Sequence, residues 1–183
     1  MATEIKLSGF GGQGVIRMGI ILGRAASIFD GRNATLTQSF GPEARGGACS
    51  AQVIVSDETI LYPYLTQPDI LLAMSQEAYD KFEPELKPGG ILLLEQDLVA
   101  AHVPRADIRQ FALPATRIAE QMGSRMFGNM VMLGFLAATT KVTGREALHQ
   151  ALPGFVPDRS LDKNLEALDR GWEEGLKQLA AAG

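Results

Sequence analysis

The segment Ser8 to Gly14, S-G-F-G-G-Q-G, constrains the fold more than any other part of this chain. An alternating apolar pattern before it predicts a strand, and apolar residues at helical spacing follow it. Gly9, Gly11 and Gly14 have the G-x-G-x-x-G spacing of a dinucleotide-binding turn. A strand, a glycine turn and a helix in this order are typical of an open α/β sheet, with the turn at its ligand-binding edge.

The rest of the pattern extends this unit into one domain over residues 1–183. Strands are expected at Glu4–Ser8, Asn33–Gln38, Ala48–Val55, Asp69–Met74, Ile91–Glu95 and Ile108–Leu113, with Thr59–Tyr62 returning as a hairpin after Ala48–Val55. Helices are expected at Gly12–Phe29, Ser75–Leu86, Ala115–Met122, Asn129–Val142, Gly144–Leu152 and Leu161–Ala180. We therefore expect an α/β fold of three layers, with a Rossmann-like, mostly parallel sheet, a β-hairpin and a helical C-terminal third.

Three local features refine this expectation. Ser75 and Thr143 precede predicted helices and are candidate N-caps. Gly171 falls inside the last predicted helix, where we expect an interruption. The apolar helices from Asn129 onward predict an exposed apolar patch, and hence a protein partner.

Composition excludes several classes of function. Of the 183 residues, 46% are hydrophobic and 21% are charged, as in ordinary globular proteins. The formal net charge of −4 and the absence of Lys/Arg runs argue against a nucleic-acid binder. No apolar stretch is long enough for a bilayer, and the N-terminus runs directly into a strand pattern without a signal peptide. We expect no membrane contact and a cytoplasmic location.

The side chains that perform difficult chemistry are scarce. The single cysteine, Cys49, cannot hold an iron–sulfur cluster, which needs about four thiolates, and we expect it to be a small buried side chain. His102 and His149 lie far apart and have no zinc-ligand spacing. We therefore expect no catalytic residue and no metal site on this chain.

The glycine turn itself allows three interpretations. A dinucleotide fold needs an acidic residue at the end of the second strand, but this chain has Thr37, Gln38 and Ser39 there. Independent binding of NAD or FAD is therefore disfavoured. The glycines could instead serve helix–strand packing alone, or the turn could present Phe10 and Gln13 to a ligand or partner.

A second glycine-rich segment, S-F-G-P-E-A-R-G-G, follows the second predicted strand. Gly41 and Pro42 indicate a rigid turn, and Glu43 and Arg45 place both charge signs close together. In an open α/β sheet this loop lies beside the turn after the first strand. The alternative is a solvated loop in which Arg45 only pairs with Glu43.

Three motifs carry a resemblance to a known family. G-F-G-G-Q-G-V (Gly9–Val15), T-Q-S-F-G-P-E-A-R-G-G-A (Thr37–Ala48) and N-M-V-M-L-G (Asn129–Gly134) resemble the gamma subunit of 2-oxoacid:ferredoxin oxidoreductases. N-L-E-A-L-D-R-G (Asn164–Gly171) is similar to the C-terminal helix of that family. The resemblance implies a non-catalytic subunit of a complex that oxidatively decarboxylates a 2-oxoacid to acyl-CoA, CO2 and reduced ferredoxin.

The resemblance also implies where the cofactors lie. Alpha and beta subunits, and a delta subunit where one is present, would hold thiamine diphosphate, Mg and the Fe–S clusters, with coenzyme A as a substrate of the complex. Ferredoxin, or another low-potential acceptor, would take the electrons. The long second motif and Tyr62-Pro63 look most like 2-oxoglutarate members. Phenylglyoxylate- and pyruvate-type complexes, and a free-standing nucleotide-binding oxidoreductase, remain alternatives.

The candidate site residues gather in the two glycine-rich segments and at the start of one helix. We expect Asn129 to be an N-cap or a buried hydrogen-bonding group, with a site role as the alternative. Arg17 and Arg24 share a face of the first predicted helix, which either is solvated or meets another chain. The residues expected to bind a cofactor or contact a subunit are Gly9, Phe10, Gly11, Gly12, Gln13, Gly14, Ser39, Gly41, Pro42, Glu43, Arg45, Gly46, Gly47 and Asn129.

Overall fold

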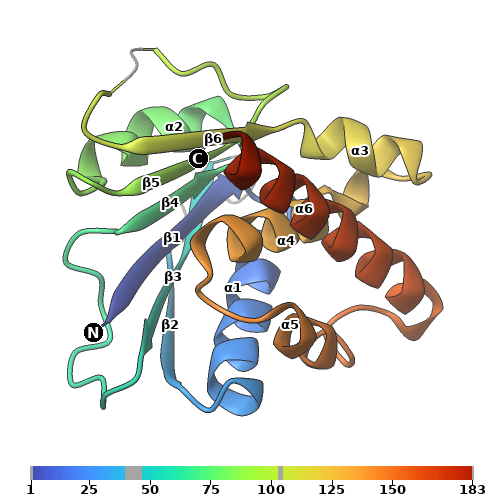
Figure 1. The fold of residues 1–183 in the computed structure, drawn as a ribbon, viewed down its shortest axis with the longest axis horizontal. Helices are drawn as coiled ribbons and strands as arrows, with labels where there is room; N and C mark the ends of the chain where they lie inside the picture. The colour runs from blue at the N-terminus through green and yellow to red at the C-terminus, as the bar shows by residue number, and fades with distance from the viewer. Residues whose placement is uncertain (1, 40–46, 103–104, 183) are drawn as a thin grey trace.

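A single six-stranded sheet runs through the computed structural model, which describes residues 2–39, 47–102 and 105–182 (Figure 1). The strand order is β2-β3-β1-β4-β5-β6. Three of the five pairings are parallel, and β3 is antiparallel to both of its neighbours. The strands are β1 (Thr3–Phe10), β2 (Asn33–Ser39), β3 (Ala48–Ser56), β4 (Ile70–Ala73), β5 (Ile91–Glu95) and β6 (Arg109–Leu113).

The β-hairpin lies one connection earlier than the sequence suggested. β2 pairs with β3, whereas the predicted return strand Thr59–Tyr62 has no regular structure. β3 ends at the edge of the sheet where β4 begins, so the chain needs only a loop to pass from one to the other. Glu4 holds this loop, because its Oε2 accepts hydrogen bonds from the backbone N–H groups of Thr66 (2.8 Å) and Gln67 (2.9 Å). The Glu4 carboxylate thus satisfies these two backbone N–H groups, which have no partner in the sheet.

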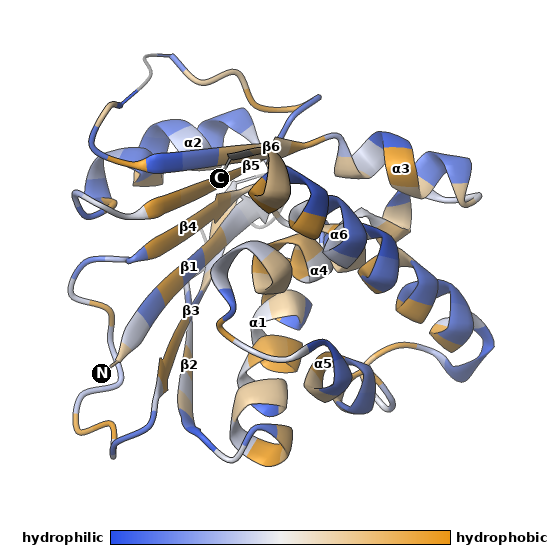
Figure 2. Ribbon diagram, viewed as in Figure 1, coloured by the Kyte–Doolittle hydropathy of each residue, from blue (hydrophilic) through white to orange (hydrophobic). Residues whose placement is uncertain are grey.

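The two faces of the sheet are covered unequally, which gives the expected three layers (Figure 1). α2 (Gln76–Phe82) covers one face, together with the chain that follows it, and there Tyr79 and Phe82 pack with Leu71 and Leu92. The larger core on the opposite face is covered by α1 (Val15–Arg24), α3 (Ala115–Gln121), α4 (Gly128–Thr140), α5 (Arg145–Ala151) and α6 (Leu161–Ala182). Figure 2 shows the apolar strands facing these helices, while α6 turns a hydrophilic face outward. In the described ranges, no helix has both the length and the apolarity needed to span a bilayer.

The first helix changes its geometry before it ends. α1 passes into a π-helical turn, η1 (Ala25–Phe29), which closes with a hydrogen bond from the Asp30 N–H to the Ala25 carbonyl at 3.0 Å. Gly31, with φ 68°, then takes the chain out of the helix, whose predicted end at Phe29 is confirmed.

α4 is the structural centre of the helical layer. Every residue from Gly128 to Thr139 is buried, so this helix forms core and not the exposed apolar patch that its sequence suggested. α6 lies against α4 with their backbones close together. A β-carbon on Gly134 would overlap the Leu168 carbonyl, and one on Gly171 would overlap the Val131 carbonyl. The interruption predicted at Gly171 is therefore wrong, because this glycine permits close packing inside one continuous helix.

One of the two predicted caps is confirmed. The Ser75 hydroxyl accepts a hydrogen bond from the Ala78 N–H at 3.3 Å at the start of α2. Thr143 does not cap α5, because its hydroxyl donates to Asp30 Oδ2 and Gly144 occupies the cap position. Thr143 thus ties the start of α5 to the end of the π-helical turn.

We predict that Gly171→Ala lowers the free energy of unfolding by about 3 kcal/mol, because the new methyl group meets a backbone carbonyl that cannot move aside. The matched control is Gly23→Ala in α1, where a β-carbon would meet no atom within 4 Å. This control should raise the unfolding free energy by about 0.5–1 kcal/mol. Urea denaturation measures both effects, and equal values for the two variants would contradict the close α4–α6 contact.

Candidate functional site

The glycine turn joins β1 to α1 at the carboxyl edge of the sheet. β1 ends at Phe10, and α1 begins at Val15. Gly12 and Gly14 have φ values of 99° and 79°, in the left-handed region that favours glycine. Gly11 and Gly12 are exposed, so the backbone of the turn is open to solvent in front of the first turn of α1.

Gln13 closes this turn from inside. Its side-chain Oε1 accepts from the Phe10 N–H at 2.7 Å, and its Nε2 donates to the Met74 carbonyl at 2.9 Å. A β-carbon on Gly9 would lie 2.5 Å from that Oε1, so Gly9 leaves room for the Gln13 amide. The amide of Gln13 thus holds the turn to the end of β4, while the Phe10 ring is the exposed side chain.

Asn129 brings the start of α4 to the same turn. The residue is buried, and its Oδ1 accepts from the Met130 N–H at 2.9 Å. Its amide nitrogen occupies the space that a β-carbon on Gly14 would need. Asn129 is therefore the buried hydrogen-bonding group that the sequence suggested, inside the first turn of α4. The starts of α1 and α4 meet here, and neither has an acidic residue in its first turn.

The second glycine-rich segment is anchored beside the first. Ser39 ends β2, and Ala48 begins β3 directly opposite Phe10 in the register. Glu77, at the start of α2, accepts a hydrogen bond from the Ala48 N–H at 3.3 Å. The described ends of the second segment, Ser39 and Gly47–Ala48, therefore lie at the same edge of the sheet as the glycine turn. The other candidates of this segment, Gly41, Pro42, Glu43, Arg45 and Gly46, lie outside the described residues.

Exposed apolar side chains lie at the ends of the elements that form this edge. Phe10 is 38% exposed, and Met126 is 78% exposed in the short helical turn η3 (Arg125–Phe127) before α4. Met130 and Met132 are fully buried core side chains. Of these three methionines, only Met126 is thus available to a partner.

Glu95 is a buried carboxyl that sequence reasoning missed. It ends β5 and is fully buried, and its oxygens accept from the N–H groups of Asp97 (3.1 Å) and Thr116 (3.0 Å). Burial raises the pKa of this carboxyl, despite the opposing effect of those hydrogen bonds. One oxygen holds the start of α3 at Thr116 and the other holds the turn after β5 at Asp97. Glu95 therefore supports the edge and is not aimed at a ligand.

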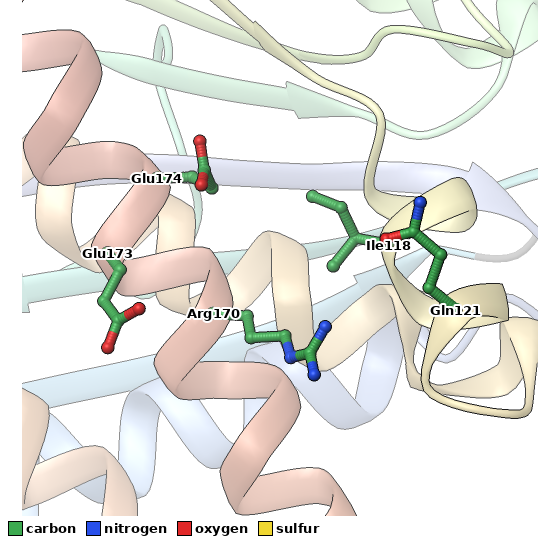
Figure 3. Close-up of a pocket in the computed structure, with 5 residues that line it drawn as sticks. All are labelled: Ile118, Gln121, Arg170, Glu173 and Glu174. Carbon is green, nitrogen blue, oxygen red and sulfur yellow. The ribbon is translucent and has the colours of Figure 1, made fainter.

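A shallow pocket of about 290 Å³ lies between α3 and α6 (Figure 3). Ile118 and Gln121 on α3 face Arg170 and Glu174 on α6. Arg170 already pairs with Glu166 at 2.8 Å, and Glu174 pairs with Lys177 at 2.6 Å. Arg170 and Glu174 are thus already paired within α6, and Glu173 of the same helix completes the lining.

Comparison with known proteins identifies the family. The sequence profile described as pyruvate ferredoxin/flavodoxin oxidoreductase matches residues 4–174. The chain belongs to this family. It is 46% identical over 175 residues to the 2-oxoglutarate synthase subunit KorC of Methanocaldococcus jannaschii, and the match covers 94% of each chain.

Two solved structures of this family share the fold. The keto/oxoacid ferredoxin oxidoreductase gamma subunit of Geobacter sulfurreducens has a TM-score of 0.87 and 40% identity, over 97% of this chain and 98% of that one. The 2-oxoglutarate:ferredoxin oxidoreductase of Magnetococcus marinus, with 2-oxoglutarate, coenzyme A and succinyl-CoA bound, has a TM-score of 0.85 and 27% identity. That match covers 95% of this chain and 31% of the longer one.

The remaining chemistry-bearing side chains of this family member are few. Cys49 is buried as predicted, and burial raises the pKa of its thiol, which disfavours the reactive thiolate. Among the residues that the structure describes, no three His, Cys, Asp or Glu side chains are grouped to hold a metal ion.

We predict that Gly14→Ala lowers the free energy of unfolding by about 1–3 kcal/mol, since it adds a β-carbon at positive φ against the Asn129 amide. Gly11→Ala is the control, because it has open space and an ordinary φ, and it should change stability by less than about 0.5 kcal/mol. Combining Gly14→Ala with Asn129→Ala should cost less than the sum of the two single substitutions. Strict additivity in denaturant melts would show that the two residues do not touch.

A second prediction concerns pH and Glu95. Its pKa is raised in the folded protein, so folding favours the protonated carboxyl. Its contribution to stability is therefore complete below the unfolded pKa and is lost as pH rises through the folded pKa. Glu95→Gln cannot titrate, so the stability of the wild type relative to this variant should fall over that range. Denaturation at a series of pH values measures the difference, and a constant difference would contradict the raised pKa.

Proposed function

We propose that this chain is the gamma subunit of a thiamine-diphosphate-dependent 2-oxoglutarate:ferredoxin oxidoreductase. The complex would convert 2-oxoglutarate and coenzyme A to succinyl-CoA and CO2 while reducing ferredoxin. The observation that carries this proposal is the 46% identity to a 2-oxoglutarate synthase subunit over nearly the whole of both chains. The Magnetococcus marinus enzyme, which shares the fold of this chain, binds the same 2-oxoacid and both forms of coenzyme A.

The proposal divides the roles between this chain and its partner subunits. One cysteine cannot hold an iron–sulfur cluster, so the clusters would lie in partner subunits. The family resemblance implies that thiamine diphosphate and its Mg ion would lie there too. This chain would complete the assembly through the carboxyl edge, where Phe10 is an exposed anchor. The loop between β3 and β4 offers further exposed apolar side chains at Leu61, Tyr62 and Tyr64. The cytoplasmic location and the single domain over residues 1–183 stay predictions.

The glycine turn would also help bind coenzyme A. Its exposed backbone lies at the positive end of α1, where free N–H groups suit a phosphate. The buried Asn129 amide lies against Gly14, and the first turns of α1 and α4 carry no acid that would repel the phosphates. We assign Arg45, outside the described residues, as a further contact to coenzyme A or to a partner subunit.

The sheet topology disfavours the alternative of a free-standing dinucleotide enzyme. In such a fold the second strand lies beside the first, so that an acid at its end reaches the ribose. Here β3 lies between β1 and β2, which places the end of β2 roughly 10 Å from the turn. β2 also ends in Thr37, Gln38 and Ser39, without an acid.

The test is purification of the tagged chain from its own cells under native conditions. We expect subunits that bind thiamine diphosphate and iron–sulfur clusters to co-purify in fixed ratio. The complex should reduce a low-potential acceptor with coenzyme A and 2-oxoglutarate faster than with pyruvate or phenylglyoxylate. A preference for another 2-oxoacid would identify that acid as the substrate in place of 2-oxoglutarate. A chain that purifies alone and binds NAD or FAD would refute the proposal.

The same assay separates the coenzyme A role from the rest. Arg45→Ala should raise the KM for coenzyme A about tenfold and leave the KM for 2-oxoglutarate unchanged, because one charge-assisted contact is lost. Arg109→Ala removes the same charge from the exposed edge strand β6 and serves as the control. Equal KM values for coenzyme A in the two variants would show that Arg45 does not contact coenzyme A, and the proposed subunit identity would still stand.

A further inference from the structure

Arg24 lies at the end of α1 that is remote from the glycine turn. Its guanidinium carbon is 5.2 Å from the centre of the Phe155 ring and 5.8 Å from that of Phe29. Both distances are within the range of cation–π contact. Because α1 is about 15 Å long, this group is separate from the candidate site at the start of the helix.

The π-helical turn creates the arrangement. Phe29 follows Arg24 by five residues, a spacing that places side chains on different faces of an ordinary α-helix. In a π-helical turn the backbone hydrogen bond joins residue i to residue i+5, as between the Ala25 carbonyl and the Asp30 N–H in η1. Side chains five residues apart therefore come together. π-Helical turns are destabilised relative to α-helix and occur frequently at functional sites. This turn presents a cation between two aromatic rings.

The positive charge of Arg24 has no acidic partner among the residues that the structure describes. The other partly buried arginines there are paired: Arg32 with Asp57 at 2.8 Å and Arg105 with Glu83 at 3.0 Å. Arg24 Nε is enclosed and makes no hydrogen bond. A partly desolvated guanidinium held by two rings is preorganised for a carboxylate, which it can bind with its terminal nitrogens.

The surface around Arg24 combines this charge with an apolar contact. Ile28, four residues later, is 61% exposed, and Ser27 beside it is also exposed. A central arginine with aromatic and aliphatic neighbours is the composition of a protein–protein hot spot. A two-fold contact between copies of this chain, centred here, would bring two Arg24 side chains together, and the charges would repel. The charge therefore selects a different chain.

We propose that Arg24, Ile28, Phe29 and Phe155 form a docking surface for a partner subunit that presents a carboxylate side chain beside an apolar one. This inference rests on the proposed function, which supplies the partner subunits. It assigns a second contact between this chain and the complex, at the opposite end of α1 from the glycine turn. The Arg24–carboxylate pair would be covered by the partner and would slow its dissociation.

The experiment titrates the purified chain onto the remaining subunits of its own complex, prepared without it, and measures Kd. Arg24→Met keeps a flexible apolar stem between the two rings and removes the charge. It should weaken binding about 30-fold or more, because the partner's carboxylate is left buried and unpaired. Arg24→Lys keeps the positive charge but lacks the planar guanidinium, so its Kd should lie between those of the wild type and Arg24→Met. Arg109→Met, an exposed charge removal on β6, should stay within about fivefold of the wild type.

The outcomes are distinguishable. Arg24→Met binding within about fivefold of the wild type, with an unchanged thermal transition, would overturn the docking surface and leave the proposed function intact. If Arg24→Met does not fold, Ile28→Asp decides, because its carboxylate would repel the partner's and its site is exposed. Binding weakened by about tenfold supports the surface, and unchanged binding overturns it. If the wild-type chain does not bind these subunits, the proposed function fails, and the docking surface fails with it.

Discussion

The contact between the backbones of α4 and α6 supports the helical half of this protein. Gly134 and Gly171 remove the side chains that would hold the two helices apart, and Gly175 does the same against Ala138 one turn further along. α4 is therefore enclosed on all sides, with the sheet beneath it and α6 above. An enclosed helix cannot rotate or slide without disturbing the core, so its first turn is held in a fixed place. That first turn carries Asn129 to the glycine turn.

The carboxyl edge is thus assembled from elements that are far apart in the sequence. Gln13 fixes the turn to the end of β4, Asn129 fixes the start of α4 to Gly14, and Glu95 fixes the start of α3 to β5. Each of these polar side chains is used within the chain. Among the described residues, this edge presents outward the backbone of the glycine turn and the side chains of Phe10 and Met126, which suit recognition and positioning better than acid–base chemistry. This agrees with a subunit that contributes shape and contacts while partner subunits supply the reactive groups.

Local signals in the sequence predicted local structure well. The β5 strand, the Ser75 cap and the end of the first helix at Phe29 all depend on neighbouring residues, and each appears where it was expected. The errors concern distant partners. Thr143 bonds with Asp30, and Glu4 holds the loop after the predicted strand Thr59–Tyr62 at Thr66 and Gln67. Gly171 packs against α4 and does not end its own helix. The insertion of β3 between β1 and β2 left no trace in the pattern, since alternation does not specify which strand pairs with which. Arg24 and Phe29 could not be paired from α-helical spacing, because the π-helical turn brings them together.

The central position of β1 has a consequence for synthesis of the chain on the ribosome. β1 is made first, yet its two neighbours, β3 and β4, are complete only at Ser56 and Ala73. At about 5–20 residues per second, both edges of an apolar strand stay unpaired for several seconds. During that time the nascent chain presents two open strand edges to other nascent chains. The antiparallel β3 closes one edge before β4 closes the other, so the hairpin protects the first strand during translation as well as shaping the folded sheet.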